Sequence, residues 1–217
     1  TAIVSTLANA SVLEGLLGPD GSDDLVQGTS ANDSLSATIS GTSSERLYGY
    51  AGDDELNGGS GNDLLDGGSG NDTLIGGDGD DILIDGNGAD IFDAGNGDDI
   101  LILSGLDFQS IDGGAGTDTL VLKGIDLVLD GTSAILNIEK IDLGYDHDTN
   151  VLDLSDAGVL AATSGGVLQV TGDANDIVRL TGAWTVEPSQ NIGGTIYDQY
   201  MLNGTTVQIE QGVHVIA

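Results

Sequence analysis

Cysteine is absent from this chain of 217 residues, and its absence excludes both a disulfide framework and a thiolate metal site. Basic residues are nearly absent too, since 4 Lys and Arg stand against 36 Asp and Glu, giving a formal net charge of −32. Nucleic acids and anionic membrane surfaces are bound through Lys and Arg, so both are excluded as partners. No apolar run approaches the ~20 residues of a membrane span, and no N-terminal signal peptide is visible.

Proline is scarce and glycine abundant, with 2 and 36 copies respectively. Of the 36 acidic residues 30 are Asp, and Asp combined with Gly is typical of turns and metal-binding loops rather than helices. The hydrophobic fraction of 39% is too high for a solvated tail. We therefore expect a core surrounded by bound cations, because a compact chain of this charge would otherwise repel itself. The first residue is Thr1 rather than Met, and we expect the chain to be a piece of a larger protein.

A nine-residue repeat begins at Gly49 and continues without insertion to Ile102. Each of its six blocks has Gly at the fourth place, Asp at the sixth and a large apolar residue at the eighth. The blocks read GYAGDDELN, GGSGNDLLD, GGSGNDTLI, GGDGDDILI, DGNGADIFD and AGNGDDILI. The pattern G-G-x-G-x-D-x-U-x, where U is a large apolar residue, is a calcium-binding β-helix repeat.

Weaker copies of the block flank the six regular ones. Their sixth place is held upstream by Asp23, Asp33 and Glu45, and downstream, after a one-residue slip at Leu103, by Gln109 and Asp118. The eighth-place residues of all the copies are apolar, and we expect them to form one core stripe: Leu25, Leu35, Leu47, Leu56, Leu65, Leu74, Leu83, Phe92, Leu101, Ile111 and Leu120. A flexible Gly/Asp linker would not keep such a residue in phase.

The spacing of the block suits calcium. The first six residues form a turn in which Gly allows positive φ, and the last three form a short strand whose middle side chain points inward. Ca²⁺ takes 6–8 oxygens and accepts mixtures of carbonyls and carboxylates, whereas Mg²⁺ demands a regular octahedron and dehydrates reluctantly. The sequence therefore predicts that the turns bind Ca²⁺ rather than Mg²⁺.

Two blocks are expected to complete one coil, so that each block stacks on the block two places away. This parity predicts one column of Asp54, Asp72 and Asp90, and a second of Asp63, Asp81, Asp99 and Asp118 that starts at Glu45. Carboxylates stacked about 4.8 Å apart repel one another unless a cation bridges them. Calcium is thus predicted to be part of the fold.

After Val121 the pattern changes to that of ordinary β-strands. The segment VLDLSDAGVLAAT predicts a strand that enters a short helix, with Ser155 as the N-cap. The stretches VLQVT, IVRLT, TIYDQYML and TTVQIEQ alternate as strands do, and VHVIA closes the chain. TGDANDIVR repeats the block loosely around Asp176 and is read either as a further calcium turn or as an Asx-type hairpin turn. We expect this region to have a purely structural role, as a β cap over the open end of the roll.

The six regular blocks resemble the RTX (repeats-in-toxin) family. The later stretches NIEKIDLGYDHDTNVLDLSDAGVL and VTGDANDIVRLTGAW resemble the C-terminal region of giant bacterial RTX adhesins. The resemblance implies type I secretion, with an uncleaved C-terminal signal, export of an unfolded chain and folding outside the cell. The apolar residues 213–217 are compatible with such a signal.

By this resemblance the calcium ligands are the sixth-place carboxylates and the backbone carbonyls of the glycine-rich turns. The expected set is Asp54, Asp63, Asp72, Asp81, Asp90, Asp99, Asp118, Asp23 and Asp33, with Gly49, Gly58, Ser60, Gly67, Ser69, Gly76, Asp78, Gly86 and Gly95. Glu45, Gln109 and the slip at Leu103 put the sites that they would complete in doubt.

The sequence thus predicts an all-β protein, with a right-handed parallel β-roll over residues 1–121 and a β-rich cap with one short helix over residues 122–217. We expect a non-catalytic module of a secreted or surface adhesin, monomeric and not inserted in a membrane, whose partners are calcium ions and the type I secretion machinery. One alternative is the calcium-binding tail of a secreted protease or lipase, although neither H-E-x-x-H nor G-x-S-x-G occurs in the chain. Another is an ice- or glycan-binding module, but the third- and fifth-place residues form a mixed and charged row that suits ice poorly.

Overall fold

The computed structural model describes residues 24–37, 44–131, 134–144 and 149–217. Its contacts divide the chain into two units, one of residues 1–101 with 107–116 and the other of residues 102–106 with 117–217. The boundary at residue 121 that the sequence suggests stays a prediction. Among the described residues no helix is long and apolar enough to cross a membrane.

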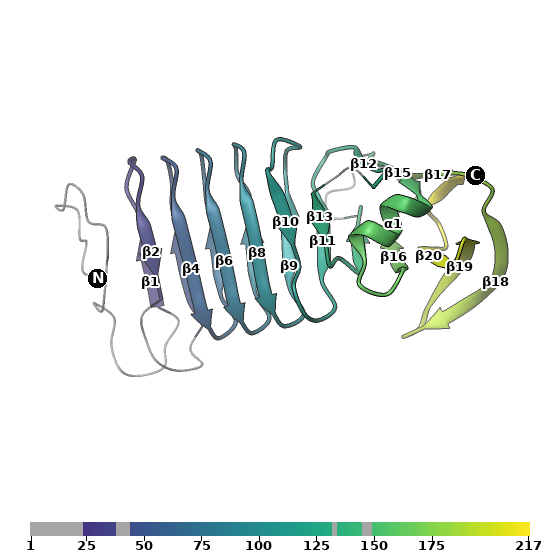
Figure 1. Ribbon diagram of the computed structural model, residues 1–217, viewed down its shortest axis with the longest axis horizontal. Helices are drawn as coiled ribbons and strands as arrows, with labels where there is room; N and C mark the ends of the chain where they lie inside the picture. The colour runs from purple at the N-terminus through teal and green to yellow at the C-terminus, as the bar shows by residue number, and fades with distance from the viewer. Residues whose placement is uncertain (1–23, 38–43, 132–133, 145–148) are drawn as a thin grey trace. The chain divides into compact units, whose positions relative to one another are not determined.

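The first unit is a coil of short parallel strands. One sheet contains β1 (Asp24–Gln27), β3 (Glu45–Tyr48), β5 (Leu64–Asp66), β7 (Ile82–Ile84) and the start of β9 (Ile100–Leu103). The other contains β2 (Ser34–Ser36), β4 (Glu55–Ser60), β6 (Thr73–Asp78), β8 (Ile91–Asn96) and β10 (Ser110–Asp112). Figure 1 shows β4, β6 and β8 side by side.

Strands two blocks apart pair in register. Leu56 of β4 lies opposite Leu74 of β6, and Leu74 lies opposite Phe92 of β8. The other sheet pairs Leu47 with Leu65 and Leu65 with Leu83 in the same way. The prediction that two blocks complete one coil of a parallel β-roll is confirmed.

The eighth-place side chains fill the space between the two sheets. Ten of them are at most 1% exposed: Leu35, Leu47, Leu56, Leu65, Leu74, Leu83, Phe92, Leu101, Ile111 and Leu120. The prediction for Leu25 was wrong, because Val26 is the residue in register with Leu47, and Leu25 points outward and is 49% exposed. The first described turn is thus shifted by one residue, which places Asp24 opposite Glu45.

Glycine is required where successive turns touch through their backbones. A Cβ at the fourth-place Gly70 would lie 1.9 Å from the carbonyl oxygen of Gly52, and the φ of Gly70 is +133°. The second-place Gly86 meets Gly68 in the same way, with a Cβ 1.9 Å from its carbonyl oxygen. Any side chain at these places would push the turns apart, so the spacing of the stack depends on them.

The second unit also contains parallel strands, so coiling continues where the sequence suggested ordinary β-structure. One sheet orders β11 (Thr119–Leu122), β14 (Lys140–Asp142), β16 (Val167–Thr171), β20 (Thr205–Glu210), β19 (Thr195–Leu202) and β18 (Thr185–Ile192), and the last two pairings are antiparallel. The other orders β12 (Leu127–Leu129), β15 (Val151–Ser155), β17 (Ile177–Thr181) and β21 (His214–Ile216), and β13 (Ile135–Leu136) is a short additional strand. A buried row crosses the first sheet: Leu120, Ile141, Val170 and Ile209.

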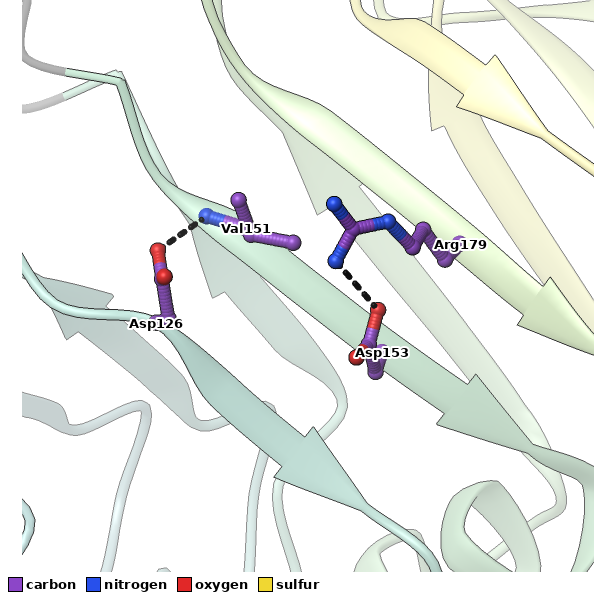
Figure 2. A network of polar contacts seen from close by, with 4 residues as sticks. All are labelled: Asp126, Val151, Asp153 and Arg179. Atoms are coloured by element: carbon purple, nitrogen blue, oxygen red, sulfur yellow. Dashed lines mark hydrogen bonds and ion pairs between the residues drawn. The ribbon is translucent and has the colours of Figure 1, made fainter.

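Polar contacts tie β12, β15 and β17 together on their outer face (Figure 2). The carboxylate of Asp126 accepts a hydrogen bond of 2.8 Å from the N–H of Val151. Arg179 lies opposite Asp153 in the strand register and forms an ion pair with it at 3.4 Å. Both groups of that pair are partly exposed, so we expect its contribution to stability to be small.

The single short helix predicted from the sequence is confirmed. It is α1 (Asp156–Ala162), and it begins at Ser155, whose Oγ accepts a hydrogen bond of 3.0 Å from the N–H of Gly158. This bond satisfies one of the amides that the first turn of a helix leaves without a partner.

We predict that Leu83→Ala destabilises the calcium-loaded protein by about 2–5 kcal/mol, because it opens a cavity between the sheets. The matched control is Ile82→Ala, on the outer face of the same strand, where we expect a loss of about 1 kcal/mol or less. Urea unfolding in excess Ca²⁺ measures both changes. Equal midpoints for the two variants would contradict the assignment of the core face.

Candidate calcium sites

The sixth-place aspartates stack in two columns within the first unit. In the column of Asp54, the N–H groups of Asp33, Asp54 and Asp72 donate to Oδ1 of Asp54, Asp72 and Asp90 at 2.7, 2.8 and 2.7 Å. In the column of Asp63, the N–H groups of Glu45, Asp63 and Asp81 donate to Oδ1 of Asp63, Asp81 and Asp99, each at 2.7 Å. Each carboxylate is therefore fixed by the backbone of the turn two blocks before it.

In most of the sixth-place carboxylates the second oxygen has no hydrogen-bond partner. Oδ2 is buried and without one in Asp54, Asp63, Asp72, Asp81, Asp99 and Asp118, and none of these residues is more than 3% exposed. An unpaired buried carboxylate oxygen is costly, because burial removes the water that would solvate its charge. These oxygens need a positively charged partner.

Backbone carbonyls face the same spaces. A Cβ built on Gly49 would lie 2.5 Å from Oδ2 of Asp54 and 2.5 Å from the carbonyl oxygen of Gly67, two blocks later. A Cβ on Gly76 would lie 2.4 Å from Oδ2 of Asp81 and 2.4 Å from the carbonyl oxygen of Ala94. The first place is therefore usually Gly because a carboxylate and a carbonyl crowd against it.

Two acceptor oxygens cannot hydrogen-bond to each other, but a hard cation can bind both. Calcium fits this donor set, since it accepts carboxylate and carbonyl oxygens together. In the part of the chain that the structure describes, no three His, Asp or Glu side chains converge on a metal position. Each site would therefore combine sixth-place carboxylate oxygens with backbone carbonyls of the stacked turns.

Comparison with known families decides what these turns are. The model of the RTX calcium-binding nonapeptide repeat matches residues 39–74, 66–101 and 110–122. These segments are RTX calcium-binding repeats. RTX repeats bind several Ca²⁺ ions and are typical of secreted proteins. No curated protein matches the chain.

The RTX turns bring the predicted first-place residues to the carboxylates. Gly49, Gly58, Gly67 and Gly76 each lie beside Oδ2 of the Asp five residues later, with a built Cβ at 2.4–2.6 Å. Gly86 and Gly95 stand one place further along the block, and the carbonyl of Gly95 accepts a bond of 2.8 Å from the N–H of Ala115. The first-place residues of these two blocks are Asp85 and Ala94.

The carbonyls of the third place already take part in stacking. Those of Ser69 and Asp78 accept bonds of 2.8 Å from the N–H groups of Gly52 and Gly61, and Ser60 lies opposite Asp78 in the strand register. A carbonyl oxygen has two lone pairs, so this bond leaves one for a cation. The roles of Ser60, Ser69 and Asp78 as ligands stay predictions.

The weaker copies on the N-terminal side of the RTX segment differ from the regular blocks. Oδ2 of Asp33 accepts bonds from the N–H and Oγ1 of Thr29, at 2.6 and 2.9 Å, and so has partners without a metal. Asp23 lies outside the described residues. Glu45 is buried and donates its N–H to the column of Asp63.

Two features of the repeats were not apparent from the sequence. The N–H of Asp118 donates to Oε2 of Glu139 at 3.2 Å, so Glu139 accepts this bond as a sixth-place Asp does in the regular blocks. The signal for this role was the apolar Ile141 two residues later, which repeats the spacing from the sixth place to the eighth. The carbonyl of Ala94 was also missed, because its block departs from Gly at the first place.

Asp176 forms a turn without an unpaired oxygen. Its Oδ2 accepts a bond of 2.7 Å from the N–H of Asp173, and its Oδ1 accepts one of 3.1 Å from the N–H of Asn150. The Asx-type bond of this turn runs from the N–H of Asn175 to Oδ1 of Asp173, at 2.7 Å. This turn leads from β16 to β17, which belong to different sheets, so it does not close a hairpin.

Fifth-place Asn and Asp side chains form a second ladder that the sequence reading missed. Oδ1 of Asn32, Asp53 and Asn71 accepts from the N–H groups of Asp53, Asn71 and Ala89 at 2.8–2.9 Å, and Asn62 and Asp80 do the same for Asp80 and Asp98 at 2.9–3.0 Å. These bonds run from the later turn to the earlier one, opposite to those of the sixth place. Each pair of stacked turns is thus held from both sides.

Burial raises the pKa of Asp54, Asp72, Asp81, Asp90 and Asp99 in the absence of metal. It raises the pKa of Asp81 from 3.8 to about 7, with a further increase from the charges of Asp63 and Asp99. Burial likewise raises the pKa of Asp54 and of Asp90 to about 6. The metal-free fold therefore favours protonated carboxylates, and the calcium-loaded fold needs them ionised.

We predict that the metal-free chain holds more β-structure at pH 5 than at pH 8. Between the unfolded pKa near 3.8 and the folded values of about 6–7, the folded state binds more protons, so the free energy of unfolding falls as the pH rises. Calcium should reverse the order, because protons compete with it for the same oxygens. Circular dichroism in metal-free and calcium-containing buffers measures both trends, and greater order at pH 8 without metal would contradict the prediction.

Gly70→Ala is expected to destabilise the calcium-loaded roll by about 2–4 kcal/mol, because its Cβ meets a backbone carbonyl and its φ disfavours a side chain. The control is Gly165→Ala, where a built Cβ meets nothing within 4 Å, and the expected change is about 0.5 kcal/mol or less. Urea midpoints in excess Ca²⁺ compare the two. Equal midpoints would show that the turns do not stack as closely as described.

Proposed function

We propose that this chain is a non-catalytic folding and secretion module of a large bacterial cell-surface adhesin, exported by a type I secretion system and folded by extracellular calcium. The observation that carries the proposal is the series of buried carboxylate oxygens without a hydrogen-bond partner. They make the folded state dependent on a cation that is scarce inside the cell and plentiful outside.

The charge of the chain supports export in an unfolded form. With 36 acidic and 4 basic residues, the chain repels itself when no cation is bound. Extracellular calcium modules bind at about 10⁻⁴–10⁻³ M. At such affinities the repeats stay empty in the cytosol and fill outside, and each turn that folds outside resists movement back through the exporter.

Coupled binding and folding gives the module a steep response. Each sixth-place Asp accepts a backbone bond from the earlier turn and faces a carbonyl of the later one, as Asp54 does with Asp33 and Gly67. A turn can bind its ion only when its neighbour is in place. Uptake of one ion therefore prepares the next site, and folding should be cooperative in Ca²⁺.

The test is circular dichroism of the chain during a Ca²⁺ titration and after addition of EDTA. We expect little β-structure in chelator at pH 7.5 and a cooperative gain at roughly 10⁻⁴–10⁻³ M Ca²⁺. A chain that is folded equally well in EDTA and in Ca²⁺ would contradict the proposal.

Asp81→Asn should raise the Ca²⁺ concentration at the folding midpoint roughly threefold or more, because the variant loses a buried carboxylate that faces the carbonyl of Ala94. Asp80→Asn is the matched control on the neighbouring residue. Asp80 is exposed, and an amide oxygen there can still accept from the N–H of Asp98. The two midpoints come from the same titration, and equal shifts would assign the effect to net charge rather than to the column.

A further inference from the structure

The turn that contains Asp72 is surrounded by more carboxylates than a regular block provides. The block before it ends with Asp66, where the blocks on either side end with Asn57 and Ile75. The block stacked on it begins with Asp85, where four earlier blocks begin with Gly. Both departures fall at the same calcium turn.

Backbone geometry brings Asp66 and Asp72 together. Asp66 directly precedes Gly67 in the chain, and a Cβ built on Gly67 would lie 2.6 Å from Oδ2 of Asp72. That oxygen is buried and has no hydrogen-bond partner, and Asp72 is 1% exposed. The unpaired oxygen therefore faces the start of the turn that Asp66 precedes.

The same turn faces Asp85. The N–H of Gly67 donates to the carbonyl of Ile84 at 3.3 Å, so Asp85 follows directly on the residue paired with Gly67. Asp85 is 4% exposed, and its Oδ1 accepts from the N–H of Gly86 at 2.6 Å. A carboxylate thus stands where the other stacked turns present only a backbone.

Asp90 is the fourth carboxylate at this turn, beside Asp66, Asp72 and Asp85. Its Oδ1 accepts the N–H of Asp72 at 2.7 Å, and Asp85 holds the first place of its block. The charges of these groups also act on one another. Burial is the main cause of the raised pKa of Asp66 and of Asp90, and the negative charge of Asp85 raises both further. The charge of Asp66 in turn contributes to the raised pKa of Asp72, where burial again is the largest cause.

We propose that the site at Asp72 is the tightest cation site of the roll and the first to be filled, and that Asp66 and Asp85 set its affinity through their charges. This inference rests on the proposed calcium-dependent function. No group of three or more carboxylates among the described residues is placed to hold a metal ion, and we assign Asp66 and Asp85 a role through their charges rather than as ligands. A regular block offers its ion a single buried carboxylate, whereas this turn adds two negative charges nearby.

The experiment is a titration of the full chain with Tb³⁺, followed by displacement with Ca²⁺. Tyr48 lies opposite Asp66 in the strand register, so tyrosine-sensitised emission reports an ion bound at this turn. We expect sensitised emission with the first equivalent of Tb³⁺, and its loss in the variant Tyr48→Phe with Tyr50→Phe.

Asp66→Asn and Asp85→Asn should each weaken binding of the first ion by about three- to tenfold relative to the later ions, as expected for removing one nearby charge. The difference should shrink in 0.5 M salt, because screening acts on charges that are not direct ligands. Asp93→Asn is the matched control, since Asp93 holds the same ninth place in a strand of the other sheet and its removal changes the net charge equally.

An unchanged ratio of first to later affinities in both Asp66→Asn and Asp85→Asn would overturn this inference, as would an equal loss in Asp93→Asn. In either case Ca²⁺-induced folding of the unmodified chain would leave the proposed function standing. Binding without any gain of β-structure in the unmodified chain would instead refute the proposed function.

Discussion

Repulsion between stacked carboxylates is the constraint on which the rest of this structure depends. The parallel coil places the same residue of every second block at the same position, so any charge in the block is repeated along the column. Asp63, Asp81 and Asp99 are at most 2% exposed and follow one another at each turn. One oxygen of each is satisfied by the backbone, and the other is left for a cation. A cation at these oxygens would offset the cost of burying their charge.

The same geometry explains why so few residue types are used. The fourth place is always Gly and the second is Gly in five of the six regular blocks, because successive backbones touch there, and the eighth requires a large apolar residue because it fills the interior. The fifth place favours Asn and Asp because their oxygens accept an amide from the next turn. Only the outward third, seventh and ninth places vary freely. The departures at Asp66 and Asp85 stand out because the rest of the pattern is strict.

Much of this arrangement was predictable from the sequence, because a strictly periodic sequence gives a regularly repeating structure. The coil of two blocks, the columns of Asp54 and Asp63 and the core from Leu35 to Leu120 follow from the nine-residue phase. Leu25 was misplaced because its block has no neighbouring regular copy to fix the phase. The continuation of the coil through Ile141 and Val170 was missed because these turns differ in length, and a period cannot be recognised once it varies. Glu139 was missed because a Glu reaches the same amide from a longer side chain.

The distance of eighteen residues between stacked turns also determines how such a roll can lengthen in evolution. A duplication of eighteen residues adds one whole coil, with both columns extended and each outer face continued by side chains of its own kind. A duplication of nine would move every later strand to the opposite sheet, and outward residues such as Leu64 and Ile82 would then join the face that now carries Thr73 and Glu55. Calcium capacity therefore grows in whole coils. A gene that recombines within its own repeats can change the number of ions while keeping the chemistry of each face.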